Sequence, residues 1–178
     1  MKRNKILALI LALTAILAIA LTGCGEDSGE TEWADKAFGD ITISLPGEFQ
    51  DVNQSNGVYT CAGPGASVTV SEATPADIGP EDWTQELLED NLGIMYGATY
   101  TDISLLSFEG NVDINGDPAV CFDLQGTNSS GKVRVIRNVY LFNDEAGEQY
   151  VIALIYTDGD SFFSDEVCDT ILASITRN

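Results

Sequence analysis

The sequence predicts an α+β domain, built on an antiparallel β-sheet of about six or seven strands flanked by helices. Short segments in which apolar and polar residues alternate, as they do in strands, fill most of the chain after residue 38. Two longer segments place apolar residues at helical spacing instead. The order is strands, one helix, strands joined by short turns, and a last helix. This order predicts helices that cover an antiparallel sheet.

The first strands are predicted at 41–45, 58–62 and 67–72. In the segment 41–45 (ITISL), apolar and polar residues alternate with the period of a strand. Glycine and proline at 63–65 favour a tight turn, so the second and third strands should form a hairpin. Residues 73–80 are predicted to be a loop.

A helix is predicted to begin at Pro80 and to end at Gly97. Proline suits the first turn of a helix, and the charges of Glu81 and Asp82 suit its N-terminus. The broad apolar face of this helix consists of Trp83, Leu87, Leu88, Leu92, Ile94 and Met95. Trp83 and Tyr96 could line a ligand site, but packing in the core is the favoured interpretation.

The second half of the chain contains strands at 102–114 (one or two), 119–125, 132–142 and 150–157. The segment NGDP at 115–118 is a strong turn signal between the first two. The last strand is almost entirely apolar, which predicts a central strand covered on both faces.

The final helix is predicted to begin near Asp160 or Ser161, either of which can cap a helix, and to lie across the sheet. Its apolar positions are Phe163, Val167, Cys168, Ile171, Leu172 and Ile175. No internal repeat and no second domain are predicted.

The segments ITISLPGEF, INGDPA and ILASI resemble the PsbP-like, or Mog-like, domain. The resemblance covers residues 38–178 and implies an α/β/α sandwich around a central antiparallel sheet. Domains of this family occur in exported lipoproteins and in the extrinsic subunit of photosystem II. The resemblance implies binding, scaffolding or assembly rather than catalysis, and it brings no catalytic residues.

The N-terminus has the features of an export signal. Residues 1–5 are basic, residues 6–21 are apolar, and the motif LTGC follows at 21–24. This motif resembles the lipobox of bacterial lipoproteins, in which the cysteine receives diacylglycerol and the signal is cut in front of it. The resemblance implies a signal peptide over 1–23 and lipidation of Cys24, with acyl chains such as palmitate. The alternative is an uncleaved membrane helix with an incidental cysteine.

Residues 24–37 are polar and acidic without periodicity, so we expect a flexible tether in front of a single domain over 38–178. All 28 acidic residues lie beyond Cys24, and five basic residues remain once 1–23 are removed, which gives a net charge of −23. This charge excludes nucleic-acid binding, which needs clustered Lys and Arg. A solvated acidic surface is the simplest interpretation.

The sequence offers no catalytic, metal or cofactor motif. It contains no histidine, which removes the usual general base and the usual zinc ligand. The acidic segments 113–117 and 158–160 are interpreted as turns rather than calcium sites, because the EF-hand spacing is absent. The basic residues Lys132, Arg134 and Arg137 should neutralise nearby carboxylates, with a small anionic ligand as the alternative.

Three cysteines follow Cys24 in the chain. A location outside the cytoplasm would permit a Cys61–Cys121 disulfide, whereas the apolar surroundings of Cys61, Cys121 and Cys168 favour buried free thiols.

The expected function is that of a non-catalytic binding or assembly module, anchored through Cys24 at the outer, extracytoplasmic face of the cell membrane. Its partner would be an envelope protein or polymer. A calcium-stabilised surface domain and a carboxylate-dependent hydrolase of wall polymer are the alternatives.

Overall fold

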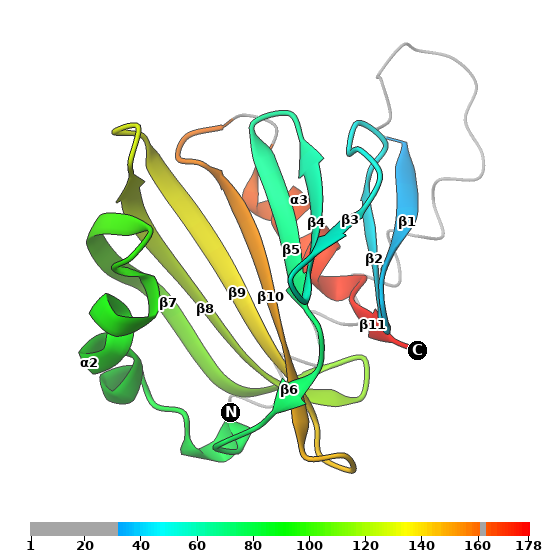
Figure 1. Cartoon of the computed structure of the whole chain (residues 1–178), viewed down its shortest axis with the longest axis vertical. Helices are drawn as coiled ribbons and strands as arrows, with labels where there is room; N and C mark the ends of the chain where they lie inside the picture. Colours follow the sequence, from blue (N-terminus) through cyan, green and yellow to red (C-terminus); the bar gives the residue numbers. More distant parts are fainter. Residues whose placement is uncertain (1–31, 161–162) are drawn as a thin grey trace, which may run out of the picture. The chain divides into compact units, whose positions relative to one another are not determined.

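The computed structural model describes residues 32–160 and 163–178, which form two antiparallel sheets with helices packed against them (Figure 1). Cys24 and the predicted signal peptide over 1–23 lie outside the described residues. So does the first part of the predicted tether, up to residue 31.

The large sheet has the strand order β3-β4-β5-β10-β9-β8-β7, and the short strand β6 pairs with β10 in line with β5. Its strands are β3 (Asn53–Ser55), β4 (Val58–Gly63), β5 (Ala66–Ser71), β6 (Thr74–Pro75), β7 (Tyr100–Ile114), β8 (Asp117–Asn128), β9 (Val133–Asn143) and β10 (Glu148–Thr157). All neighbouring pairs are antiparallel, which confirms the predicted fold class. The segment 102–114 belongs to one strand, β7, with three register irregularities.

A second sheet of three strands was not predicted. It consists of β1 (Trp33–Phe38), β2 (Ile41–Pro46) and β11 (Thr176–Arg177). The boundary predicted at residue 38 is therefore wrong, because residues 33–37 pair with β2 instead of belonging to a tether. Trp33 packs against the core. The segment was mistaken for a linker because the charged residues Asp35 and Lys36 lie in its middle.

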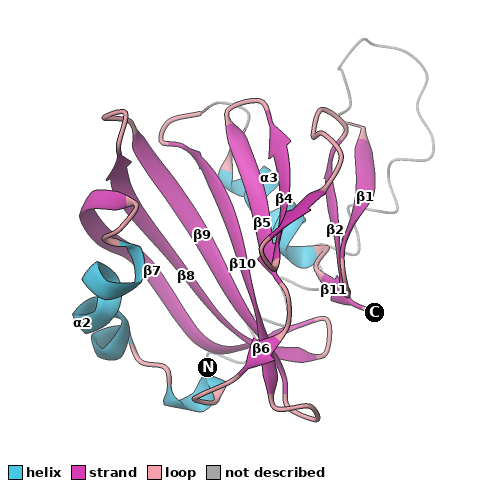
Figure 2. Cartoon of the chain, in the orientation of Figure 1, coloured by secondary structure: helices cyan, strands magenta, loops and turns pink. Residues whose placement is uncertain are grey.

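The two α-helices of the described residues are α2 (Gln85–Tyr96) and α3 (Asp165–Ala173), shown with the strands in Figure 2. Pro80 begins a separate 3-10 turn, η1 (Pro80–Asp82), and α2 begins after Thr84, whose Oγ1 accepts a hydrogen bond from Leu87 N at 3.1 Å. Similarly, Ser164 caps α3, rather than Asp160 or Ser161. A hydroxyl that satisfies a first-turn N–H fixes each start. No helix in the described residues has the length and apolar character needed to cross a membrane.

Two apolar cores lie on opposite faces of the large sheet. The larger one packs the sheet against the three-stranded sheet and α3, and it includes Ile43, Ile152 and Ile171. The smaller one packs α2 against β8 and β9 through Leu88 and Leu92. The predicted broad apolar face of α2 is only partly correct, because Leu87 is exposed and Ile94 is 82% exposed. The helix contacts the sheet along a narrow stripe near β7.

The strand β10 is central, as predicted, but it is not fully covered on both faces. Tyr150, Ile152 and Leu154 are buried in the larger core. The intervening side chains of Val151 and Ala153, like that of Ile155, are only half-buried. Because α2 lies over the β7 side of the sheet, it does not extend over β10 (Figure 1).

Candidate functional site

The predicted basic cluster does not form one site. Arg134 and Arg137 are three residues apart on β9, and therefore lie on opposite faces of the sheet. The guanidinium of Arg137 contacts Asp123 at 3.3 Å, Asp165 at 2.8 Å and Asp169 at 3.1 Å. Arg137 neutralises carboxylates, as predicted.

The pKa values of Arg137 and its partner Asp123 follow from burial and from their opposite charges. Burial raises the pKa of Asp123, and Arg137 lowers it in part. Burial lowers the pKa of Arg137, but Asp123 and the other partners more than offset this, so the pKa lies above its ordinary value. Arg137 and its three aspartate partners therefore form an ion-pair network that holds α3 against the sheet, and not a proton donor for a substrate.

Arg134 binds oxygen atoms of the chain itself. Its guanidinium donates to Thr157 Oγ1 at 2.8 Å, and to the carbonyl oxygens of Gly65 at 3.2 Å and Ile155 at 3.4 Å. These bonds hold the end of the β4–β5 hairpin against β10. No observation therefore favours the small anionic ligand considered for this cluster.

The acidic segment 113–117 forms the predicted turn between β7 and β8. Asn115 and Gly116 have φ angles of +52° and +100°, as a tight hairpin turn requires. Asn115 Nδ2 donates to the carbonyl oxygens of Ala173 and Ile175, and Asp117 pairs with Arg177 at 2.5 Å. Within residues 32–160 and 163–178, no three acidic or cysteine side chains come together as metal ligands would.

Cys61, Cys121 and Cys168 are free thiols. Of the two alternatives, the structure therefore has free thiols and not the Cys61–Cys121 disulfide. Cys61 and Cys168 are buried in the larger core. Burial also raises the pKa of Cys121 to about 12, so that thiol stays protonated near neutral pH. These cysteines act as small apolar side chains.

Trp83 packs in the core, as favoured, whereas Tyr96 both packs and lines a groove. The Trp83 ring centroid lies 4.7 Å from that of Tyr140 and 6.4 Å from that of Phe122. The Tyr96 hydroxyl donates to Asn138 Oδ1 at 3.0 Å. Burial, followed by the neighbouring Tyr140, raises the pKa of Tyr96.

Beside Tyr96 the uncovered part of the large sheet forms an open groove of about 490 Å³, which we name the α2 groove. Its apolar and aromatic lining includes Met95, Tyr96, Tyr100, Val151, Ala153 and Ile155. The groove exists because α2 covers β8 and β9 but leaves the same face of β10 half-open. Two features of the sequence pointed toward it: the apolar run of β10, and Tyr96, which was considered as a residue that could line a ligand site.

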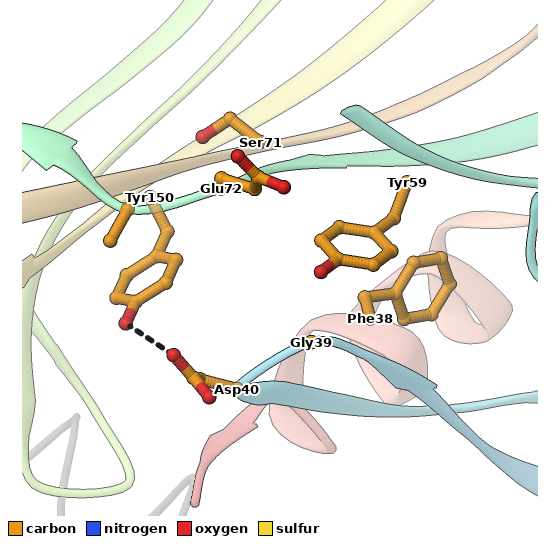
Figure 3. A pocket seen from close by; sticks show the side chains of 8 residues that line it. Phe38, Gly39, Asp40, Tyr59, Ser71, Glu72 and Tyr150 are labelled. Carbon is orange, nitrogen blue, oxygen red and sulfur yellow. Dashed lines mark hydrogen bonds between the residues drawn. The ribbon is translucent and has the colours of Figure 1, made fainter. Parts of the chain in front are cut away.

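A second hollow, which we name the acid–aromatic pocket, has a volume of about 250 Å³ (Figure 3). It opens where the β1–β2 turn meets the ends of β4, β5 and β10. It is lined by Phe38, Gly39, Asp40, Tyr59, Ser71, Glu72, Ala73 and Tyr150. Sequence analysis missed this pocket, because its acidic and aromatic residues come from distant segments and have no motif.

Comparisons with known proteins identify the fold. No protein-family model matches the chain, and no curated protein sequence matches it. The crystal structure of the Saccharomyces cerevisiae Ran-binding protein Mog1p is 11% identical, with a TM-score of 0.57 over 83% of this chain and 96% of Mog1p. The solution structure of cyanobacterial PsbP from Synechocystis sp. PCC 6803 is 12% identical, with a TM-score of 0.58 over 89% of this chain and 99% of that one.

A third similar structure is LpqN of Mycobacterium tuberculosis, described as involved in cell envelope biogenesis. It is 14% identical, with a TM-score of 0.49 over 84% of this chain and 86% of LpqN. The fold assignment rests on the first two structures: this chain has the PsbP-like, or Mog-like, fold that its sequence segments predicted.

Proposed function

We propose that this protein is a lipid-anchored, extracytoplasmic binding module that docks an envelope protein without turning over a substrate. The observation that carries the proposal is the α2 groove. An antiparallel sheet that faces water on one side normally presents polar side chains there. Here the half-open face of β10 presents Val151, Ala153 and Ile155 instead.

The groove favours an apolar segment of a partner protein as its occupant. Its open volume of about 490 Å³ accommodates a few apolar or aromatic side chains, the residue types that dominate binding energy at interfaces. The five basic and 28 acidic residues beyond position 23 give the domain a strong overall negative charge, which favours long-range encounter with a basic partner.

The fold supports a role in protein recognition. Mog1p, which has the same fold, is described as a Ran-binding protein. Because the two sequences are only 11% identical, the partner of Mog1p is not a candidate partner here. What carries over is that this fold can serve protein recognition.

The predicted anchor gives a weak binding surface a useful local concentration. Eight residues separate Cys24 from Trp33, where β1 begins, and eight extended residues span at most about 28 Å. A domain held this close to the membrane meets other membrane-bound proteins at a raised effective concentration. Stable anchoring would need two or more acyl chains on Cys24.

The ion-paired carboxylates favour neither the calcium-stabilised domain nor the hydrolase. Asp123, Asp165 and Asp169 are neutralised by Arg137, and Asp117 by Arg177, which leaves no calcium-like arrangement among these carboxylates. The shifted pKa of Asp123 is accounted for by burial and its ion pair. A hydrolase would need a separate acid and base facing one cleft, and Asp40 and Glu72, which both line the acid–aromatic pocket, are the pair that the turnover assay below must test.

A site-specific crosslinking experiment tests the proposal. A photo-activated amino acid replaces Val151 in the groove or, as a control, the exposed Ala146 in the β9–β10 turn of the intact chain in cells. We expect position 151 to form an adduct with one envelope protein and position 146 to form none. Equal adducts, or none at 151, would contradict docking through the groove.

A turnover assay tests the other half of the proposal. The purified intact protein is incubated with wall fragments, peptides and phosphate esters. We expect no saturable turnover. Turnover that one Asp→Asn or Glu→Gln substitution abolishes would replace the binding module with a carboxylate-dependent hydrolase.

A further inference from the structure

The acid–aromatic pocket combines two kinds of groups that bind organic cations. The rings of Tyr59 and Tyr150 lie on two sides of the hollow, while Asp40 and Glu72 lie on the other two (Figure 3). Aromatic rings attract cations through their quadrupole, and carboxylates form charge-assisted hydrogen bonds with guanidinium and ammonium groups.

The two carboxylates have no cationic partner within residues 32–160 and 163–178. Asp40 Oδ2 accepts only a long hydrogen bond of 3.5 Å from the Tyr150 hydroxyl. Glu72 Oε1 accepts a hydrogen bond of 2.5 Å from the neutral amide of Gln54. By contrast, Arg137 and Arg177 pair with other carboxylates. The pocket therefore holds two carboxylates that no cation of the described residues contacts directly.

Tyr150 adds a buried polar group. Its side chain is 5% exposed, and its hydroxyl points toward Asp40 at the outer limit of hydrogen-bond distance (Figure 3). Burial, followed by the nearby Asp40 and Glu148, raises the pKa of Tyr150, and Arg177, which is paired with Asp117, lowers it only in part. A cationic N–H donor would satisfy both the phenol oxygen and the carboxylate.

The walls of the pocket are held in place before any ligand arrives. Gly39 has a φ of +66°, and a Cβ at this position would lie 2.9 Å from the Tyr59 hydroxyl, so the ring stands directly over the β1–β2 turn. Ser71 Oγ accepts a hydrogen bond from Val151 N at 2.9 Å and joins β5 to β10 at the pocket rim. Such preorganisation reduces the entropy lost on binding.

The size of the pocket favours one side chain over a whole small molecule. Its volume of about 250 Å³ lies below the roughly 300–1,000 Å³ of pockets that bury drug-sized ligands. Carboxylates on opposite sides suit a planar, delocalised guanidinium with several donors better than a compact ammonium.

We propose that the acid–aromatic pocket binds the side chain of an arginine presented by a partner protein. This inference uses Asp40, Glu72, Tyr59 and Tyr150, none of which lines the α2 groove. It goes beyond the proposed function and can fail while docking through the groove holds.

Ligand-detected saturation-transfer NMR on the intact, detergent-solubilised protein tests the pocket. The probes are the capped tripeptides Gly-Arg-Gly, Gly-Lys-Gly and Gly-citrulline-Gly, in which citrulline is the uncharged isostere of arginine. We expect the arginine peptide to bind saturably, the lysine peptide to bind more weakly, and the citrulline peptide to bind at least about tenfold more weakly than arginine.

Two double variants separate a built site from general charge attraction. Asp40→Asn/Glu72→Gln removes both pocket charges, whereas Glu86→Gln/Asp90→Asn removes two exposed charges of α2. We expect the pocket variant to lose at least about tenfold in affinity for the arginine peptide and the α2 variant to stay within twofold. Equal losses, or unchanged binding in the pocket variant, would overturn the proposal.

Tyr59→Leu keeps both carboxylates and removes one ring, so it serves as a second test if the double variant does not fold. We expect a several-fold loss of arginine-peptide binding, and no change would overturn the proposal.

Absence of arginine-peptide binding to the wild-type protein up to about 10 mM would also overturn it. Preferential binding of Ca²⁺ at Asp40 and Glu72 would overturn it in favour of a metal site. Ala153→Glu, in the α2 groove, should leave arginine-peptide binding unchanged.

Discussion

The hydroxyl of Tyr96, at the end of α2, donates a hydrogen bond of 3.0 Å to Oδ1 of Asn138 in the middle of β9. Among the described residues, Asn138 is the one polar side chain that is fully buried. Its Nδ2 donates to the carbonyl oxygen of Ile136 at 3.2 Å. The bond fixes the C-terminal end of α2 over the sheet, and this position makes Tyr96 a wall of the α2 groove.

Removing the Tyr96 hydroxyl should therefore weaken the fold. Tyr96→Phe leaves Asn138 Oδ1 without its donor, and we expect the free energy of unfolding in urea to fall by about 1–3 kcal/mol. Tyr59→Phe removes a half-buried hydroxyl for which no hydrogen bond is found within the described residues, so its effect should stay within about 0.5 kcal/mol. Equal effects would show that Asn138 does not depend on Tyr96.

Two isoleucines in the two helices provide a matched pair for the packing of α3. Ile171 is 2% exposed, whereas Ile94 on α2 is 82% exposed. We expect Ile171→Ala to lower the free energy of unfolding by about 2–5 kcal/mol and Ile94→Ala to change it by no more than about 0.5 kcal/mol. A small effect at Ile171 would mean that α3 is peripheral to the larger core.

Arg137→Met should destabilise the protein in a pH-dependent manner. The substitution leaves Asp123 half-buried without its cation, and we expect a loss of about 2–4 kcal/mol at pH 7. The pKa of Asp123, already raised by burial, would rise further. A proton then binds the folded variant more tightly than the unfolded one, so the variant's stability falls as pH rises. Urea melts at several pH values should show the loss shrinking toward pH 4.

The double variant Arg137→Met/Asp123→Asn is the control for this interpretation. It removes both charges, so it should recover much of the lost stability and depend less on pH. If it is no more stable than Arg137→Met, the loss comes from packing rather than from an unpaired carboxylate.

The elements that the sequence predicted well are those whose signal is local. Alternation located β2, and glycine and proline located the β4–β5 hairpin. The Asn115-Gly116 turn also formed as expected, because both residues tolerate positive φ. The apolar spacing that ends at Ile171 and Ile175 located α3.

The elements that the sequence did not predict depend on distant partners. The segment 33–37 has no alternation of its own and becomes a strand because β2 offers it an edge. β11 is two residues long and pairs with β2 from the far end of the chain. The exposure of Ile94 could not be foreseen either, since it depends on where α2 crosses the sheet.

The candidate sites were even less accessible to sequence analysis. Tyr59 and Tyr150 meet in one pocket only because β4 and β10 both flank β5. Asp40 and Glu72 are two of 28 acidic residues, and nothing in their neighbours distinguishes them. The α2 groove results from incomplete cover of β10, which is a property of the packing.

The anchor rests on the motif at 21–24, and a metabolic label tests it. Cells that express the protein are grown with a labelled fatty acid, and wild type is compared with Cys24→Ala. We expect label in the wild-type protein and none in the variant, because the motif predicts the Cys24 thiol as the attachment point. Equal label in both proteins would contradict lipidation at Cys24.

Docking of a partner through the α2 groove is the central claim about this protein. The most direct measurement is the affinity of the crosslinked envelope protein for the Ala153→Glu and Ala146→Glu chains. Both variants add one carboxylate, but only residue 153 lines the groove. We predict that Ala153→Glu weakens binding by at least about tenfold and that Ala146→Glu leaves it unchanged within twofold. Equal affinities for the two variants would contradict the account.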